Sequence, residues 1–216
     1  MKSFRICMQN IRKWGSNSRI KMCLIMSFLF VYSYISGMWK IIPLVGEKMN
    51  PWIFPFLFCW RFMKIVFMAP IVFIFCDAPF IDSNQSYVML RTSRKKWCFG
   101  QVLYIYAGSV IYAFVLFFST IIINIGHIKW GTSWGKVLGS AGTSTVLSTL
   151  GINYTTVKVP TIVIRYYTPA QAMFFSFLLM VLSFIFIGLL IYTVNVITKT
   201  NVAGTIIAGF FVILTA

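Results

Sequence analysis

The sequence predicts an all-α, polytopic helical membrane protein with about five spans, because three observations agree. First, 59% of the residues are hydrophobic and only 10% are charged, whereas soluble domains are roughly 45–50% apolar and about 25% charged. Second, the apolar residues fall in separate stretches of about the length that crosses roughly 30 Å of hydrocarbon as a helix. Third, the basic residues stand in short blocks between these stretches. Lipid is the environment that suits such a surface.

The charge balance carries information about topology. The formal net charge is +16, from 19 Lys and Arg against 3 Asp and Glu. Nucleic-acid-binding proteins gather such charge on a polar domain, and the sequence has no polar domain to carry it. We therefore expect no nucleic-acid partner, and we interpret the basic blocks through the positive-inside rule, which places them on the cytoplasmic side of the cell membrane.

Residues 1–21 predict a cytoplasmic amphipathic helix that lies in the membrane interface. Phe4, Met8 and Ile11 recur at helical spacing, and most basic residues fall on the other side. A disordered basic tail is the alternative. The first span is predicted at 22–38, and the basic residues that precede it predict a cytoplasmic N-terminus. These residues are Lys2, Arg5, Arg12, Lys13, Arg19 and Lys21.

Four further apolar stretches predict the remaining spans. Residues 126–169, which are rich in Gly, Ser and Thr, are expected to form an external segment, and Pro169 to start the span after it. The last stretch would reach only about 22 Å as a helix. We therefore expect either a truncated C-terminus inside the fifth span or a re-entrant last helix. The four stretches are 55–76, 102–125, 172–196 and 202–216.

The stretch 55–76 contains two cations and a proline. Arg61 and Lys64 are costly inside a span unless their side chains reach the interface or face protein or water. Both lie near the outer interface, which favours the first explanation, and a place on the transport path is the alternative. Pro70 is expected to kink the helix, because it removes one backbone hydrogen bond.

Residues 77–101 form the most informative segment. They contain two of the three acids, Asp77 and Asp82, together with aromatic residues and a basic cluster. The number of preceding spans places this segment in the cytoplasm. An ordinary positive-inside loop accounts for the cluster without a partner, but accounts less well for the acidic and aromatic residues. The cluster is Arg91, Arg94, Lys95 and Lys96.

Residues suited to catalysis are scarce. Glu47, Asp77 and Asp82 are the only acids and His127 is the only histidine, so neither paired intramembrane carboxylates nor a metal site is expected. The stretch 131–136 is one residue short of a phosphate-binding loop and lies in the external segment. We therefore expect no cofactor, and we expect that the chain is not an enzyme by itself.

Several motifs resemble bacterial permease subunits of ABC exporters. The first runs over Cys76-Asp77-Ala78-Pro79-Phe80-Ile81-Asp82. It is followed by Tyr87, Leu90-Arg91-Thr92, Arg94-Lys95-Lys96-Trp97 and Gly100-Gln101. The stretch from Tyr167 to Ala172, leading into Phe186-Ile187-Gly188-Leu189-Leu190, looks similar to the start of the fourth span of the same permeases. The resemblance is sharpest over residues 76–101.

The resemblance implies a six-span permease that works with other proteins. Its partners would be an ATP-binding cassette ATPase subunit and a second permease subunit, in a homodimer or heterodimer within the lipid bilayer. Residues 77–101 would be the coupling segment that docks on the ATPase. Our alternative is a non-transporting membrane assembly, immunity or sensor protein that binds a partner through the same basic loop. The coupling residues implied are Asp77, Phe80, Asp82, Tyr87, Arg91, Arg94 and Trp97.

Overall fold

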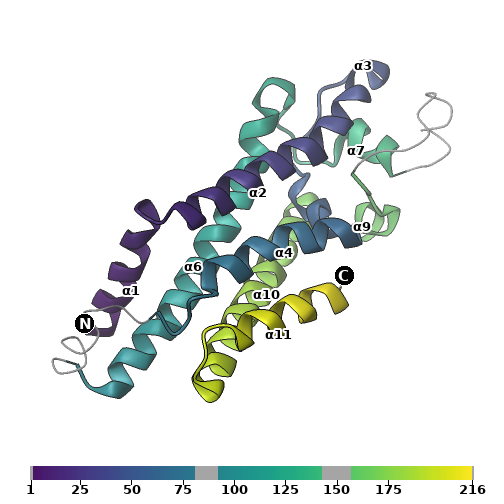
Figure 1. Ribbon diagram of the computed structural model, residues 1–216. Coiled ribbons are helices and arrows are strands. Elements are labelled where there is room, and N and C mark those ends of the chain that lie inside the picture. Colours follow the sequence, from purple (N-terminus) through teal and green to yellow (C-terminus); the bar gives the residue numbers. More distant parts are fainter. Residues whose placement is uncertain (1, 81–91, 143–156, 216) are drawn as a thin grey trace. The chain divides into compact units, whose positions relative to one another are not determined.

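A computed structural model describes residues 2–80, 92–142 and 157–215 of the chain (Figure 1). The described residues form α-helices joined by short 3-10 turns, with one isolated parallel bridge between Met49 and Ile128. The all-helical fold class predicted from composition is confirmed. In chain order the α-helices are α1 (Lys2–Arg12), α2 (Ser18–Ser36), α3 (Ile42–Val45), α4 (Arg61–Phe75), α6 (Arg94–Asn124), α7 (Gly135–Ala141), α9 (Thr161–Tyr166), α10 (Pro169–Thr198) and α11 (Ala203–Leu214).

Three helical segments of the described chain are long and apolar enough to cross a membrane. They are Ser18–Val45, Arg94–His127 and Pro169–Thr198, with 28, 34 and 30 residues. They contain the stretches predicted at 22–38, 102–125 and 172–196, and α10 begins at Pro169 as expected. The chain is therefore a helical membrane protein in which three of the expected spans have helices of sufficient length.

The stretch 55–76 differs from the prediction. Instead of one helix it forms a 3-10 helix at Phe54–Phe58 and then the 15-residue α4. At about 1.5 Å per residue, α4 is only about 22 Å long, which is short of the roughly 30 Å hydrocarbon core. Pro55 stands in the first turn of the 3-10 helix, and Pro70 lies inside α4, which continues through it.

Two other predicted boundaries also change. The last apolar stretch forms α11, whose 12 residues extend about 18 Å, so this helix alone is too short to span. The external segment predicted at 126–169 contains two short helices, α7 and α9, and α9 begins at Thr161. Pro160 directly before it adopts an extended conformation and serves as the N-cap of α9.

The helices fall into two compact units, each made of segments that are distant in sequence. The first unit contains Met1–Met26, Met68–Ala113 and Val181–Ala216, and the second contains Ser27–Phe67 and Phe114–Met180. Each unit has its own buried apolar residues.

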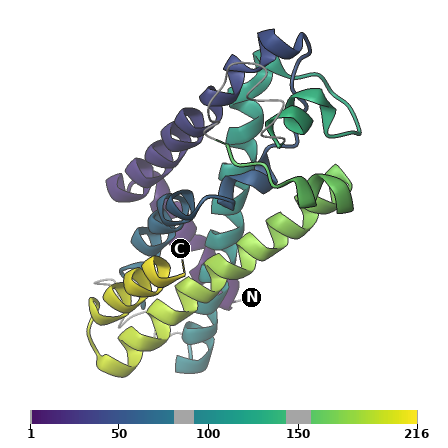
Figure 2. The ribbon, with the colours of Figure 1, turned by 90° about the vertical axis from the view of Figure 1, so that its right-hand side faces the viewer.

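In the first unit α1 lies beside the opening turns of α6, and α11 turns back along the end of α10 (Figures 1 and 2). Its core includes Phe75, Ile105, Tyr112 and Phe184, all buried. Gly188 lets α10 approach this core, since a Cβ atom there would lie 2.6 Å from Ile105 Cγ2. Small residues allow helices of membrane proteins to pack closely, and Gly188 has this role in α10.

In the second unit aromatic residues anchor the segments on either side of α3. Phe54 packs edge-on to Phe117 with ring centroids 5.5 Å apart. Trp39 stacks on His127 at 4.8 Å and donates a hydrogen bond to Asn124. Burying aromatic rings explains why the 55–58 stretch is so apolar without being part of a spanning α-helix.

Candidate functional site

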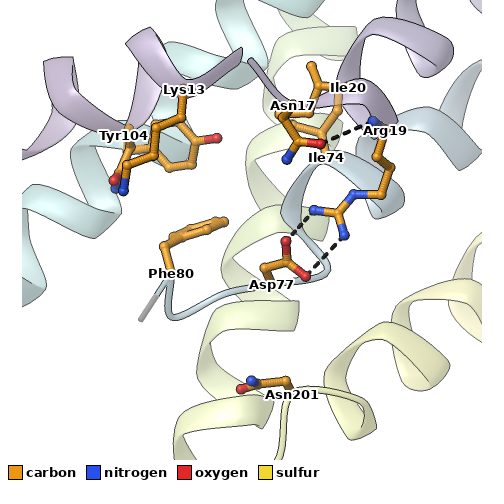
Figure 3. Close-up of a pocket in the computed structure, with 10 residues that line it drawn as sticks. Lys13, Asn17, Arg19, Ile20, Ile74, Asp77, Phe80, Tyr104 and Asn201 are labelled. Carbon is orange, nitrogen blue, oxygen red and sulfur yellow. Dashed lines mark hydrogen bonds and ion pairs between the residues drawn. The ribbon is translucent and has the colours of Figure 1, made fainter. Parts of the chain in front are cut away.

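The turn at 76–80, which follows α4, is tied to the start of α2. Arg19 contacts both carboxylate oxygens of Asp77 through its two terminal nitrogens (Figure 3). A guanidinium and a carboxylate in this two-pronged arrangement form one of the stronger charge-assisted contacts in proteins. The pair holds the end of α4 against the N-terminal segment.

The Arg19 hydrogen bond holds the pKa of the Asp77 carboxyl below its ordinary value, although partial burial opposes this effect. A lowered pKa in the folded state means that the pair stabilises the fold above the ordinary carboxyl pKa, and that this contribution is lost as the pH falls through the lowered pKa. The Asp77 side chain is 57% exposed, so solvent screening keeps the contribution small. The main effect of the pair is to fix the position of the 76–80 turn relative to the start of α2.

A second connection runs from the N-terminal segment to α6 through aromatic rings. Trp14 donates a hydrogen bond of 2.7 Å to the hydroxyl of Tyr104. Phe80, at the end of the turn, packs edge-on to Tyr104 with ring centroids 4.7 Å apart. Phe80 has a positive φ of 54°, which is uncommon for a bulky residue. Its ring thus fills the space between the turn and α6.

The amphipathic helix α1 is fixed along α6 by side-chain hydrogen bonds. The Ser3 hydroxyl donates to the Lys96 carbonyl at 2.9 Å, and the buried Asn10 amide donates to Gln101 at 2.9 Å. Gly100 permits this contact, because a Cβ atom there would lie 3.0 Å from Ile6 Cβ. The N-terminal helix covers Lys2–Arg12, which is shorter than the expected 1–21, and these contacts define its inner face.

The outer face of α1 fits the predicted position in the membrane interface. Phe4 and Met8 are exposed at 59% and 37%, whereas Ile6 and Cys7 are buried. Of the three residues that defined the expected apolar face, the two nearest the N-terminus thus point away from the protein. Exposed apolar residues beside Arg5 and Arg12 are typical of a helix whose apolar face enters lipid.

The opening turn of α6 carries three exposed cations, Arg94, Lys95 and Lys96. No acidic residue stands in this turn. Positive side chains at a helix N-terminus face the positive end of the helix dipole, which disfavours them by a few tenths of a kcal/mol each. Trp97, one residue further, is only 8% exposed, so it serves packing and adds little to an outward surface.

A small cavity of about 270 Å³ lies between these elements in the first unit. Apolar side chains of Ile20, Ile74 and Phe80 line part of it. The rest of the described wall is polar and includes the acid Asp77 (Figure 3). The remaining polar lining residues are Asn10, Lys13, Asn17, Arg19, Tyr104 and Asn201.

The structure places only some of the sequence-predicted site residues near one another. Asp77 and Phe80 share the turn beside α6, and Arg94 opens that helix. Asp82, Tyr87 and Arg91 lie outside the described residues. Arg61 and Lys64 belong to the second unit, at the start of α4, where Arg61 is exposed and Lys64 is half-buried.

The chain was compared with known proteins at the level of families, curated sequences and solved structures. No protein-family model, no curated protein and no solved structure matches the chain. The case for a function therefore depends on the chemistry of α1, the 76–80 turn and α6.

The sequence reasoning missed Arg19, Tyr104 and Asn195 as structural partners of this site. From the sequence, Arg19 is one of the six basic residues that precede the first span, and nothing in the sequence pairs it with Asp77. Asn195 donates a 2.7 Å hydrogen bond to the Ala78 carbonyl and accepts one of 2.7 Å from the Gly204 backbone. A single buried amide in an otherwise apolar stretch was the available signal.

Proposed function

We propose that the chain is a membrane-spanning permease subunit of an ABC transporter. It would move a substrate across the cell membrane with ATP hydrolysed by a separate partner subunit. The observation that carries the proposal is the exposed basic opening turn of α6, which continues directly into a membrane-crossing helix. Because α6 is one continuous helix, a displacement of its opening turn would be transmitted to the part of the helix inside the membrane.

The length of α6 supports this proposal. Its 31 residues extend about 46 Å, whereas the hydrocarbon core is roughly 30 Å thick. About ten residues therefore project beyond the core, and the polar, basic end from Arg94 to Gln101 is the part suited to do so. A protein that docks on this projecting end could therefore move the whole of α6.

The projecting end of α6 is connected to α1 and to the 76–80 turn by side-chain contacts. Ser3 and Asn10 fix α1 along α6. Trp14, just after α1, bonds to Tyr104 of α6, and Phe80 packs against the same ring. A displacement of the α6 end thus also moves α1 and the end of α4. Coupled motion of several helices is what a transport cycle requires of a docking segment.

The exposed cations supply a reason for docking. Arg94, Lys95 and Lys96 oppose the helix dipole, so they do not serve the local stability of α6. An acidic surface on a partner protein would form favourable electrostatic contacts with these three cations. The positive-inside rule also favours them on the cytoplasmic side, where ATP is available.

The experiment is charge reversal of this turn. The tagged full chain is purified from its native membranes in mild detergent, as the wild type and as R94E/K95E/K96E. We expect ATP hydrolysis to accompany the wild-type chain. In the variant it should fall at least about tenfold, because each opposed charge costs on the order of 1 kcal/mol in a complementary interface.

The matched control is K48E/K129E/R165E, which reverses three exposed cations of the second unit. It should retain the activity, and the sidedness of both variants is checked, because basic residues direct insertion. Absence of ATP hydrolysis from the wild-type preparation would contradict the proposal and favour a non-transporting assembly, immunity or sensor protein.

A further inference from the structure

We propose that the outer face of α1 is a binding surface for anionic phospholipids of the leaflet beside the opening turn of α6. This assigns to α1 a class of lipid as its partner, beyond a position in the membrane interface. Selection of this lipid would hold whether or not the chain transports a substrate. The outer face consists of the exposed residues Phe4, Arg5, Met8, Gln9 and Arg12, which helical spacing keeps on one side of α1.

The packing of α1 within the protein uses a different side of the helix. Ile6, Cys7 and Asn10 are buried, and they lie on the side that faces α6. On the outer face Phe4 is 59% exposed and Met8 is 37% exposed, so these two side chains contribute little to that packing. A helix with apolar residues on two sides, one of them open, is suited to a second apolar environment.

The charges of the outer face are positive. Arg5 and Arg12 are both exposed, and within the described residues neither forms an ion pair. The first acid of the chain is Glu47, so no neighbouring carboxylate in residues 2–46 balances these two cations. Each basic residue near an anionic bilayer surface strengthens binding about fivefold. Two such residues therefore distinguish anionic lipid from zwitterionic lipid.

The register of α1 along α6 places the outer face at the depth of lipid headgroups. Ser3 bonds to Lys96 and Asn10 bonds to Gln101, so α1 lies along the part of α6 that projects beyond the hydrocarbon core. The stretch of α6 from Lys96 to Gln101 extends about 8 Å. The headgroup layer on one side of a bilayer is roughly 5–8 Å thick, since the bilayer measures about 40–45 Å and its core about 30 Å.

A short connection keeps α1 near the bilayer. Residues 13–17 separate α1 from α2, which belongs to the membrane-crossing segment Ser18–Val45 (Figure 1). Five residues extend at most about 18 Å, and residues 13–15 form a 3-10 turn that shortens this distance. The outer face is thus held where lipid is concentrated, which favours lipid over a protein as its partner.

The test measures which lipid surrounds α1 in the full chain. A fluorophore is attached at Gln9→Cys in a chain whose other cysteines are replaced by alanine, and this parent chain is reconstituted in phosphatidylcholine vesicles. Quenching is compared for brominated phosphatidylglycerol and brominated phosphatidylcholine at the same low mole fraction. We expect phosphatidylglycerol to be enriched at least about fivefold beside the fluorophore, which is the effect of about one basic residue.

Two matched double variants locate the binding. R5Q/R12Q removes the two cations of the outer face, and the enrichment should then fall at least about threefold. K48Q/K129Q removes two exposed cations of the second unit. In this control the enrichment should change less than about 1.5-fold, because the attraction between a cation and a headgroup is screened within about 10 Å.

Equal enrichment of the two lipids beside the parent chain would overturn the proposal, as would equal loss in the two double variants. Absence of quenching by both lipids would place the outer face outside the bilayer, open to a protein partner, and would also overturn it. If the cysteine-free chain does not fold, the unlabelled chain is used. Phosphatidylglycerol should then raise the thermal unfolding midpoint of the wild type more than that of R5Q/R12Q, and equal shifts would contradict the proposal.

Discussion

Replacing Gly204 by alanine is expected to lower the free energy of unfolding by about 3 kcal/mol, because the site has no room for a methyl group. A Cβ atom there would lie 2.5 Å from the Ile191 carbonyl oxygen and 2.6 Å from the Asn195 side-chain oxygen. The first contact is with the backbone of α10, which cannot move aside without bending that helix. The packing of α11 on α10 should therefore loosen.

The measurement is thermal unfolding of the purified chain in detergent, followed by circular dichroism. Gly209→Ala is the matched control on the same helix, since a Cβ atom at Gly209 meets nothing within 4 Å. That variant should be neutral or more stable by up to about 1 kcal/mol, because alanine favours a helix over glycine. Equal midpoints for the two variants would show that α11 does not pack as described.

Replacing Asn195 by leucine is the second change expected to have a large effect, about 2–6 kcal/mol. The Asn195 side chain is 2% exposed and bonds two backbone groups at once. It accepts from Gly204 in the first turn of α11 and donates to Ala78 in the turn after α4. Leucine is of similar size but satisfies neither group, and each unsatisfied buried group costs about 1–3 kcal/mol.

Thr193→Val is the control for Asn195→Leu. The Thr193 side chain is exposed, and within the described residues its hydroxyl bonds to the Leu189 carbonyl of its own helix. Its loss should change the unfolding midpoint little, because exchange of such local bonds with solvent is nearly neutral. If Asn195→Leu is as stable as Thr193→Val, the amide does not connect α10, α11 and the 76–80 turn.

The long helices could be predicted from the sequence because each apolar residue along a stretch adds to the evidence for a membrane span. The stretches at 102–125 and 172–196 are apolar over the full thickness of a bilayer, and α6 and α10 contain them. The stretch 55–76 is also rich in apolar residues. Apolar composition indicates that residues avoid water, but it does not distinguish an α-helix from a 3-10 helix. Aromatic packing around Phe54 and Phe56, both buried, fixes a 3-10 turn there.

The contacts of the candidate site could be predicted only in part. Asp77 was selected from its place in a mixed acidic and basic segment, but its partner Arg19 is 58 residues away in the sequence. Nothing in a single sequence specifies which of many cations meets a given acid. The spacing of α1 predicted a helix, whereas its inner face depends on Gly100 and Gln101 in α6.

The sidedness of the α6 opening turn tests the central claim most directly. Lys95→Cys and Trp130→Cys, both at exposed positions, are made separately in a chain whose other cysteines are replaced by alanine. A maleimide that does not cross membranes is applied to intact cells and then to permeabilised cells. We predict that position 130 reacts in intact cells and position 95 only after permeabilisation. Labelling of position 95 in intact cells would place the basic turn outside, away from any ATP-hydrolysing partner, and would contradict the account.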